Sequence, residues 1–169
     1  MHRLALVAVI TATALTMTTS MAAAATARLT GPDGADIGAV TLTETPNGVL
    51  LEAELRGLPQ GEHGFHIHEK GACTPDFGAA GGHFAGGGGQ HGYAAEDGPH
   101  AGDMPNIHVP ASGELTIEVF NGNVSLRDGE GMLLDDDGSA IVIHAKADDY
   151  ESQPSGDAGD RIACGVIEK

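Results

Sequence analysis

The sequence predicts an all-β domain, an antiparallel β-sandwich or barrel with two long functional loops. Three observations support this fold class. Short runs of alternating or β-branched residues recur, clusters of Gly, Pro and Asn separate them, and helical periodicity is scarce beyond the first residues. Many short strands with turn residues between them are typical of antiparallel sandwiches and barrels. Because Trp is absent and aromatic residues make up 4% of the chain, we expect a core of Val, Ile, Leu and Ala.

The first residues are expected to be an export leader. Residues 1–3 (MHR) form a cationic head, residues 4–21 are apolar and uncharged, and residues 22–25 (AAAA) supply the small residues of a cleavage site. This is the pattern of a secretory signal peptide, and about 18 residues with several Thr would make a poor membrane span. We therefore expect a signal peptide at 1–25 and one domain at 26–169. The domain would be exported to the periplasm or the extracellular space, with no membrane attachment after cleavage.

After the leader, the expected strands follow at short intervals. They cover residues 27–29, 37–43 (IGAVTLT), 49–55 (VLLEAEL), 65–68 (FHIH), 114–120 (ELTIEVF), 140–145 (AIVIHA) and 161–167 (RIACGVI). The turn sequences GPDG at 31–34 and PNG at 46–48 separate the first three strands, and PQG at 59–61 precedes the fourth. Such clusters mark the ends of strands.

Two segments have neither the strand period nor the helical period. Residues 69–105 are rich in Gly, including GGGG at 86–89, and residues 146–160 are rich in Asp, Ser and Gly. Structureless loops beyond about 15 residues are uncommon in compact domains and are usually functional or disordered. Because ordering a glycine-rich loop has a high entropic cost, we expect a metal ion and a disulfide to hold the first loop.

Charge and cysteine content limit the functions that fit. The formal net charge is −16 at pH 7. Such acidity argues against nucleic acid or an anionic membrane surface as a partner, and an anionic substrate would need local positive charge. Cys73 and Cys164 are the only cysteines. Export would place them where a disulfide persists, so we expect them to pair; free or intermolecular thiols are the alternative.

Histidines on two expected strands indicate part of a metal site. His66 and His68 lie two residues apart, so both imidazoles leave one face of the strand while Phe65 and Ile67 enter the other. The pair suits a two-point hold on a metal ion, although such a pair alone is weak evidence. On a later strand the same alternation turns His144 away from the two isoleucines of that run, which is consistent with a third ligand.

The glycine-rich loop carries a second set of candidate ligands: His83, His91, His100 and Asp103. The loop is too flexible to present these side chains together without a shared partner. Three imidazoles and one carboxylate make a closed tetrahedral set of the kind that structural zinc accepts. The remaining imidazoles, a nitrogen group with an open face, suit Cu(II). Loose metal binding by a disordered loop is the alternative.

At these residues the sequence resembles the copper/zinc superoxide dismutases, in their secreted bacterial branch. The resemblance covers essentially the whole chain after the leader. Its motifs are GFHIHEKGAC (64–73), GGHF (81–84), HG (91–92), HAGD (100–103), IVIHAKADD (141–149) and DRIACGVI (160–167). The resemblance implies a Greek-key barrel that binds one copper and one zinc ion per subunit. It also implies that superoxide anion is the substrate, converted to dioxygen and hydrogen peroxide. A homodimer is compatible with the sequence, which does not decide the matter.

The resemblance also implies a role for individual residues. The implied copper ligands are His66, His68, His83 and His144, and the implied zinc ligands are His83, His91, His100 and Asp103. His83 would then bridge the two ions. Asp148 matches an aspartate that accepts hydrogen bonds from a copper histidine and from a zinc histidine. Arg161 matches the arginine beside the copper channel, and the two cysteines match the disulfide that anchors the loop.

The chain departs from the family pattern at two places. The run of glycines at 86–89 leaves the rigidity of the zinc loop in question. Residues 146–160 contain one Lys and five acidic residues, so attraction of an anion would depend on Lys70 and Arg161. His63 and His108 match no ligand position, and we expect them to be surface or hydrogen-bonded histidines.

Two other functions compete with the dismutase. A non-enzymatic exported protein could bind copper and zinc on the same fold, but such a protein would lack a ligand or the arginine, and none is missing here. A zinc hydrolase needs a general base beside a single zinc ion, for which Asp148 is the only candidate. It would explain neither the fourth zinc ligand nor the HxH pair. For Arg161, the alternative is an ordinary ion pair with Asp157 or Asp160.

Overall fold

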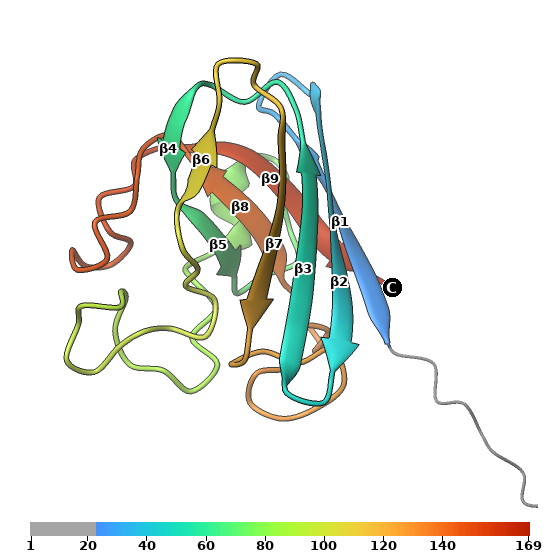
Figure 1. Ribbon diagram of the computed structural model, residues 1–169. Coiled ribbons are helices and arrows are strands. Elements are labelled where there is room, and N and C mark those ends of the chain that lie inside the picture. The colour runs from blue at the N-terminus through green and yellow to red at the C-terminus, as the bar shows by residue number, and fades with distance from the viewer. Residues whose placement is uncertain (1–22) are drawn as a thin grey trace, which may run out of the picture.

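The computed structural model describes residues 23–169, which form a strongly curled antiparallel sheet with long loops (Figure 1). The strands are β1 (Ala24–Thr30), β2 (Asp36–Thr45), β3 (Gly48–Leu55), β4 (Gly61–His63), β5 (Phe65–His68), β6 (Ile107–Val109), β7 (Leu115–Asn121), β8 (Ala140–His144) and β9 (Arg161–Glu168). Within these residues the only helical element is the short 3-10 helix η1 (Phe77–Ala80). The predicted all-β class is confirmed.

The strand order explains how distant parts of the chain meet. A seven-stranded sheet has the order β5-β8-β9-β1-β2-β3-β7, and a second sheet pairs β4 with β6. All of these strand pairs are antiparallel. The chain leaves β3 for β4 of the second sheet before it reaches β5 at one end of the large sheet, and it later crosses from β7 at the other end to β8 beside β5. As a result, β5 lies beside β8, although about seventy residues separate them in the chain.

The first strand begins earlier than the sequence indicates. β1 starts at Ala24, which pairs with Thr43 on β2, and Ala25 is buried. The sheet therefore contains the last two residues of the predicted leader. Residues 1–22 of that leader lie outside the described residues, and the signal peptide stays a prediction. Among residues 23–169, no helix has both the length and the apolar character needed to cross a membrane.

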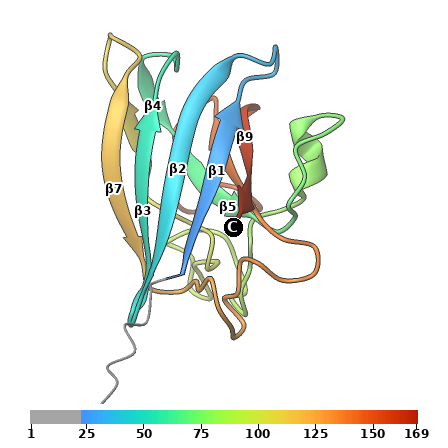
Figure 2. The same ribbon diagram turned by 90° about the vertical axis from the view of Figure 1, so that its right-hand side faces the viewer.

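The core lies inside the curl of the sheet, in which β7, β3, β2, β1 and β9 lie side by side (Figure 2). Alternating residues of each strand point inward, as a strand with one buried face requires. The inward side chains include Val40 and Leu42 of β2 and Ile141 and Ile143 of β8. The other face of β8 is buried as well, because Ala140 and Val142 pack in a second cluster with Cys164. The predicted Val, Ile, Leu and Ala core is confirmed, with Phe65, Phe84 and Met104 added.

Three long loops connect the strands, one more than the sequence indicates. Residues 69–106 join β5 to β6, and residues 145–160 join β8 to β9; both lie on the same side of the sheet (Figure 1). The third loop, residues 122–139, joins β7 to β8. It buries Val124, Leu126 and Leu133 in the main core, and the Leu126 N–H donates to Glu44 Oε2 (2.6 Å). This loop therefore contributes to the core, whereas the other two loops carry the polar clusters described below.

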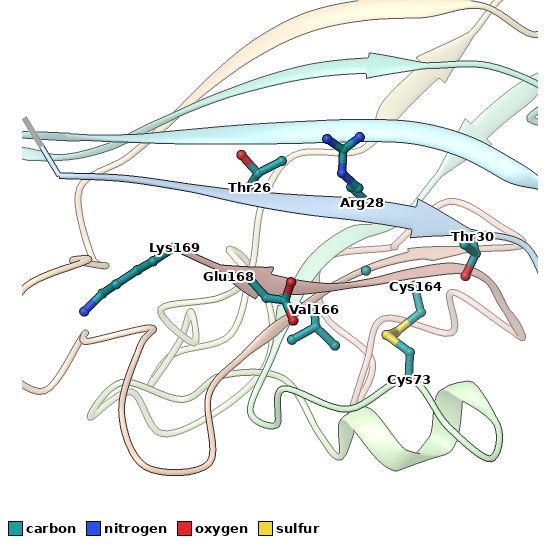
Figure 3. Close-up of a pocket in the computed structure, with 9 residues that line it drawn as sticks. Thr26, Arg28, Thr30, Cys73, Cys164, Val166, Glu168 and Lys169 are labelled. Atoms are coloured by element: carbon teal, nitrogen blue, oxygen red, sulfur yellow. A yellow bond between two sulfur atoms is a disulfide. The ribbon is translucent and has the colours of Figure 1, made fainter.

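The predicted disulfide is present and ties the first loop to the sheet. Cys73 is bonded to Cys164 of β9, with their Cα atoms 5.9 Å apart (Figure 3). The bond spans 91 residues of sequence. It fixes the start of the glycine-rich loop against the outer face of β8 and β9, where the second apolar cluster also includes Cys73 and Phe77.

Candidate metal centre

The alternation of β5 puts two histidines on the face of the strand opposite the core. Phe65 and Ile67 belong to the main core, so His66 and His68 point to the other face. In the register of β5 and β8, His66 lies opposite Val142, and residues that face each other across an antiparallel pair share a face. His144, two residues beyond Val142, therefore points to the same side as the β5 pair.

Gly64 leaves the space that these rings occupy. The His144 N–H donates to the Gly64 carbonyl (2.9 Å), so Gly64 lies directly beside that histidine. A Cβ at position 64 would lie 2.9 Å from His66 Cε1 and 3.5 Å from the Cβ of His144. Any side chain here would displace the His66 ring.

The glycine-rich loop adds a fourth ring by pairing with the edge of β5. The Phe84 N–H donates to the Ile67 carbonyl (2.9 Å), and the Glu69 N–H donates to Gly82 (3.0 Å). These bonds place His83 opposite His68 in an isolated β-bridge. On the same edge, the Ile67 N–H donates to the Gly102 carbonyl (2.9 Å). The loop thus covers β5, and its residues 83 and 102–103 approach the histidine face.

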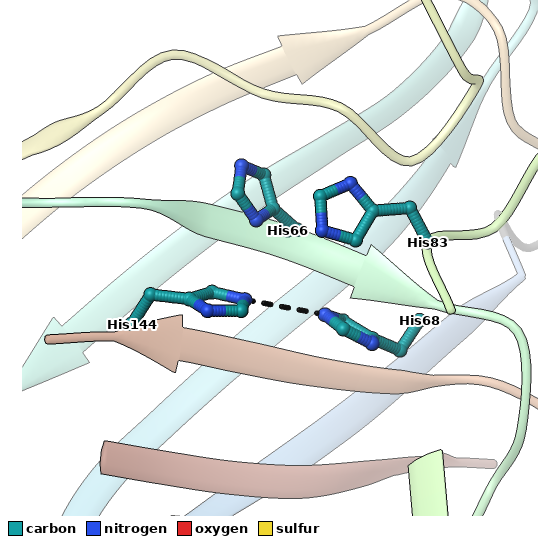
Figure 4. Close-up of side chains that lie close together, drawn as sticks. All are labelled: His66, His68, His83 and His144. Atoms are coloured by element: carbon teal, nitrogen blue, oxygen red, sulfur yellow. Dashed lines mark hydrogen bonds between the residues drawn. The ribbon is translucent and has the colours of Figure 1, made fainter. Parts of the chain in front are cut away.

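Four imidazoles converge on one point (Figure 4). One potential ligand atom from each residue lies within 4.8 Å of the other three, and all four residues are buried: His66, His68, His83 and His144. His68 Nε2 and His144 Nε2 are 3.3 Å apart. The ring centroids of His66 and His83 are 4.1 Å apart. The structure therefore brings together the whole set predicted for copper.

A second group adjoins the first and shares His83 with it. Its members also offer ligand atoms within 4.8 Å of one another: His83, His91, His100 and Asp103. Asp103 Oδ1 lies 2.7 Å from His83 Nδ1 and 3.0 Å from His91 Nδ1. Asp103 Oδ2 accepts hydrogen bonds from the backbone N–H groups of Gly92 and His100. The set predicted for zinc is thus also assembled, and its carboxylate is held by the backbone of the loop.

Asp148 joins the two groups from the second loop. Its Oδ2 lies 2.9 Å from His66 Nε2 and its Oδ1 lies 3.0 Å from His91 Nε2. Asn106 in turn holds the backbone of Asp148: the Asn106 Nδ2 donates to the Asp148 carbonyl, and the Asp148 N–H donates to Asn106 Oδ1, both at 2.8 Å. Sequence reasoning identified Asp148 and missed Asn106, because an Asn just before a short strand carries no distinctive pattern.

Unpartnered nitrogens show that the two groups fit metal ions. Among the described residues, His66 Nδ1, His83 Nε2 and His100 Nδ1 are buried and have no hydrogen-bond partner. A buried polar atom left without a partner costs free energy, so each of these needs a ligand. In His66 and His83 the other ring nitrogen is already held by Asp148 or Asp103. All-imidazole sets suit copper, and three imidazoles with a carboxylate suit zinc.

Burial keeps most of the first group in the form that binds metals. It lowers the pKa of His66 to about 4, despite the opposing hydrogen bond to Asp148, and that of His144 to about 3. Burial, with the charges of His83 and Arg161, also holds the pKa of His68 well below 6.5. These rings are neutral at pH 7, and only the neutral imidazole can bind a metal ion.

His91 differs because two carboxylates face its ring. Burial opposes its charge, but hydrogen bonds to Asp103 and Asp148 and the charges of both outweigh burial and raise the pKa of His91 to about 9. Burial would raise the pKa values of the two carboxyls. Hydrogen bonds from His83 and His91 to Asp103, from His66 and His91 to Asp148, and from backbone N–H groups to both instead hold these pKa values well below their usual range. Without bound metal, His91 is therefore in its charged form at pH 7, with a proton on both ring nitrogens.

Arg161, at the start of β9, lies against the first group. Its Nη1 donates to the Phe77 carbonyl and its Nη2 to the Gly81 carbonyl, each at 2.6 Å. The Gly81 oxygen also lies 3.0 Å from His68 Nδ1. Among the described residues, Arg161 forms no ion pair with Asp157 or Asp160, and Asp157 lies 3.9 Å from Lys146 instead. Two neutral carbonyls therefore hold the guanidinium beside His68, with no direct ion pair to Asp157 or Asp160, although the charge of Asp76 also acts on it.

Among the described residues, the two histidines outside both groups are hydrogen-bonded or at the surface, as expected. His63 is buried, with Nδ1 2.8 Å from the His144 carbonyl and Nε2 2.9 Å from the Pro59 carbonyl. His108 is exposed, and its Nδ1 lies 3.4 Å from Glu62 Oε1. Lys70, the other candidate for attracting an anion, is exposed as well.

Comparison with known proteins agrees with this geometry. Residues 37–167 match the model of the family described as copper/zinc superoxide dismutase. The chain is 51% identical over 147 residues to a superoxide dismutase [Cu-Zn] of Caulobacter vibrioides. The aligned region covers 85% of this chain and 84% of that protein. It is 48% identical over 144 residues to superoxide dismutase [Cu-Zn] 2 of Aquifex aeolicus, with 83% and 84% covered.

Solved structures give the same picture. A double mutant of a SOD-like protein from Bacillus subtilis superposes with a TM-score of 0.82 at 39% identity, covering 85% of this chain and 97% of that one. The family match, residues 37–167, begins in β2, ends in β9 and so includes both histidine groups, Asp148 and Arg161. Sequence, fold and site thus agree, and the chain belongs to the copper/zinc superoxide dismutase family.

Proposed function

We propose that the protein is a superoxide dismutase that converts two superoxide anions and two protons to dioxygen and hydrogen peroxide. The observation that carries this proposal is the pair of adjoining donor sets that share His83, each with four buried or half-buried members. The proposed copper ligands are His66, His68, His83 and His144. The proposed zinc ligands are His83, His91, His100 and Asp103.

Copper held by the first donor set would supply the one-electron chemistry between Cu(II) and Cu(I) that dismutation needs. The protein provides the other requirements. Arg161 presents a permanent positive charge and several donors beside His68, where a small anion can dock. His83 Nε2 has no hydrogen-bond partner in the protein. Whenever no metal ion is bound to it, this nitrogen can carry a proton and donate it to the peroxide product. Asp148 fixes His66 and His91, which sets the orientation of one ring in each group.

Two competing functions are less well supported. A protein of this fold that has lost a copper ligand or the arginine could bind metals without being an enzyme, but none of the residues that we propose for these roles is missing from this chain. A zinc hydrolase would use Asp148 as its general base. Asp148 has one carboxylate oxygen on His66 and the other on His91, so it has no free oxygen directed at a bound water.

The direct test is loading the purified mature protein with copper and zinc and measuring the disappearance of superoxide. We expect a second-order reaction that needs copper and a Cu(II) EPR spectrum typical of nitrogen ligation. Stoichiometric binding of both metals without consumption of superoxide would instead identify a metal-binding protein.

Removing the charge of Arg161 is expected to slow the reaction without releasing the metals. In Arg161→Ala, the second-order rate constant should fall about tenfold or more, and its dependence on ionic strength should flatten, because local positive charge raises the arrival rate of anions. Arg127→Ala is the matched control, since it removes the same charge from an exposed position on the third loop. If the two variants had equal rate constants and equal salt dependence, Arg161 would have no role in attracting the anion.

Zinc binding is expected to compete with a proton on His91. Because the pKa of His91 is raised to about 9, zinc must displace its proton throughout the neutral range. The apparent zinc affinity should rise about tenfold per pH unit between pH 6 and 8 for each displaced proton. Competition with a chelator, corrected for the chelator's own protonation, measures this slope. An affinity that does not change with pH would contradict the protonated state of His91.

We also propose that the protein is exported to the periplasm or the extracellular space. The cationic head and apolar run of residues 1–21 support this, and so does the disulfide, which persists in oxidising compartments. The pairing of Ala24 with Thr43 favours cleavage before Ala24, which would keep β1 whole. Cell fractionation with mass analysis of the mature N-terminus tests the proposal, and an intact leader on protein in the cytoplasm would overturn it.

A further inference from the structure

Part of the second loop encloses the backbone of a proposed zinc ligand in the first. We call residues 148–156 the His91 clasp. The Ala94 N–H donates to the Tyr150 carbonyl (3.0 Å), and His91 Nε2 lies 3.0 Å from Asp148 Oδ1. A Cβ at Gly92 would lie 2.1 Å from the Tyr150 oxygen, so the two loop backbones are in direct contact. His91 itself is completely buried.

Gln153 makes the most specific contact of the clasp. The His91 N–H donates to Gln153 Oε1 (3.0 Å), and Gln153 Nε2 donates to the His91 carbonyl (2.8 Å). The planar amide thus satisfies both backbone groups of His91, as a neighbouring strand would. Gln153 Nε2 also donates to the Glu151 carbonyl (3.0 Å), which fixes the side chain in this orientation.

The clasp is held in shape by its own bonds. Asp149 Oδ1 accepts from the N–H groups of Glu151 and Ser152, and its Oδ2 accepts from Ser152 Oγ. The Asp149 N–H donates to the Gly156 carbonyl (2.9 Å), which closes the turn. A Cβ at Gly156 would lie 1.7 Å from Asp148 Oδ1 and 2.7 Å from His91 Nε2. The turn therefore lies directly against the contact between His91 and Asp148, and Gln153 is presented from a defined position.

We propose that Gln153 is a positioning residue for zinc, acting through the backbone of His91. Asp148 fixes the far nitrogen of the ring, and Gln153 fixes the main chain from which the ring projects. Because both the ring nitrogen Nε2 and the main chain of His91 are held, the ring keeps its Nδ1 directed at Asp103 Oδ1, where the second donor set converges. The inference rests on the proposed assignment of His91 to zinc.

The test compares Gln153→Ala with Glu151→Gln. Glu151 lies on the same turn, and only its backbone takes part in the bonds described. Zinc release from the loaded protein to a coloured chelator should be about 10–100-fold faster in Gln153→Ala, the range found when a residue that supports a metal ligand is removed. With Co(II) in the zinc site, the visible absorption of Gln153→Ala should differ from that of the control, because the ligand geometry has changed.

Two further variants separate the ways in which the inference can fail. Gln153→Glu keeps the length of the side chain and the acceptor for the His91 N–H but loses the donor, so its zinc release should be several-fold faster than that of Glu151→Gln. It serves in place of the alanine variant if that variant does not fold. His91→Ala should lose tight zinc binding; if it does not, the ligand assignment is wrong. If His91→Ala loses zinc while the Gln153 variants match Glu151→Gln in release rate or in Co(II) absorption, only the role of Gln153 is overturned.

Discussion

His83→Ala is expected to weaken both metal sites at once and to abolish most of the dismutase activity. His83 belongs to both donor sets, and in the protein its Nδ1 faces Asp103 while its Nε2 has no partner. Removing it leaves three ligands in each set. Because removal of residues that merely support ligands costs about 10–100-fold in metal affinity, loss of the ligand should lower zinc affinity by more than about 100-fold. The Cu(II) EPR spectrum should change as well, since a nitrogen ligand has been removed.

His108→Ala is the matched control for this variant. His108 is exposed on β6 and approaches only Glu62 among the described acidic residues. It should retain the metal affinities, the EPR spectrum and the rate constant of the parent protein. If His83→Ala kept the parent's EPR spectrum and zinc affinity, the shared ligand would be disproved, and the two metals would have to bind independently.

Removal of the disulfide should produce the largest change in stability. The bond between Cys73 and Cys164 closes 91 residues of chain, and loss of a native disulfide from a small secreted domain typically lowers the free energy of unfolding by about 2–5 kcal/mol. We expect a loss in this range for the Cys73→Ala/Cys164→Ala double variant. Denaturant titration of the metal-free protein measures it without the added stability of bound metals.

The chemically reduced parent protein is the control for the two substitutions. It loses the same bond but keeps both sulfur atoms, so it separates the disulfide from the packing of Cys164, which is 1% exposed in the second apolar cluster. The two samples should lose similar free energy. An unfolding midpoint equal to that of the oxidised parent in both samples would contradict the role of the bond in holding the loop.

Much of the site could be predicted because it depends on strand periodicity. Alternation in β5 separates His66 and His68 from Phe65 and Ile67, and the structure has the same division. Alternation in β8 turns His144 away from the isoleucines, which lie in the main core. A strand has only two faces, so once one face is apolar the direction of the other side chains follows.

The residues that could not be predicted act across the fold. Gln153 and Asn106 each bond to the backbone of a residue that is distant in sequence, and no periodicity marks such an amide. The third loop was missed for a related reason, since Val124, Leu126 and Leu133 are spaced irregularly along it yet are all buried. β4 and β6 are only three residues long, too short to show alternation. Ala24 and Ala25 continue an alanine run, so nothing in the sequence separates the leader from β1.

One backbone oxygen contacts both the residue proposed to bind the substrate anion and a residue proposed to bind copper. The Gly81 carbonyl accepts from Arg161 and also faces the Nδ1 of His68. The same backbone carbonyl thus positions both the Arg161 guanidinium, which would bind the incoming anion, and the His68 ring, which would bind copper. A backbone shift at Gly81 would move docking position and ligand orientation together. Mutations in this turn are therefore expected to change the rate of anion binding and the redox potential of bound copper together. Laboratory evolution at this turn would seldom change one without the other.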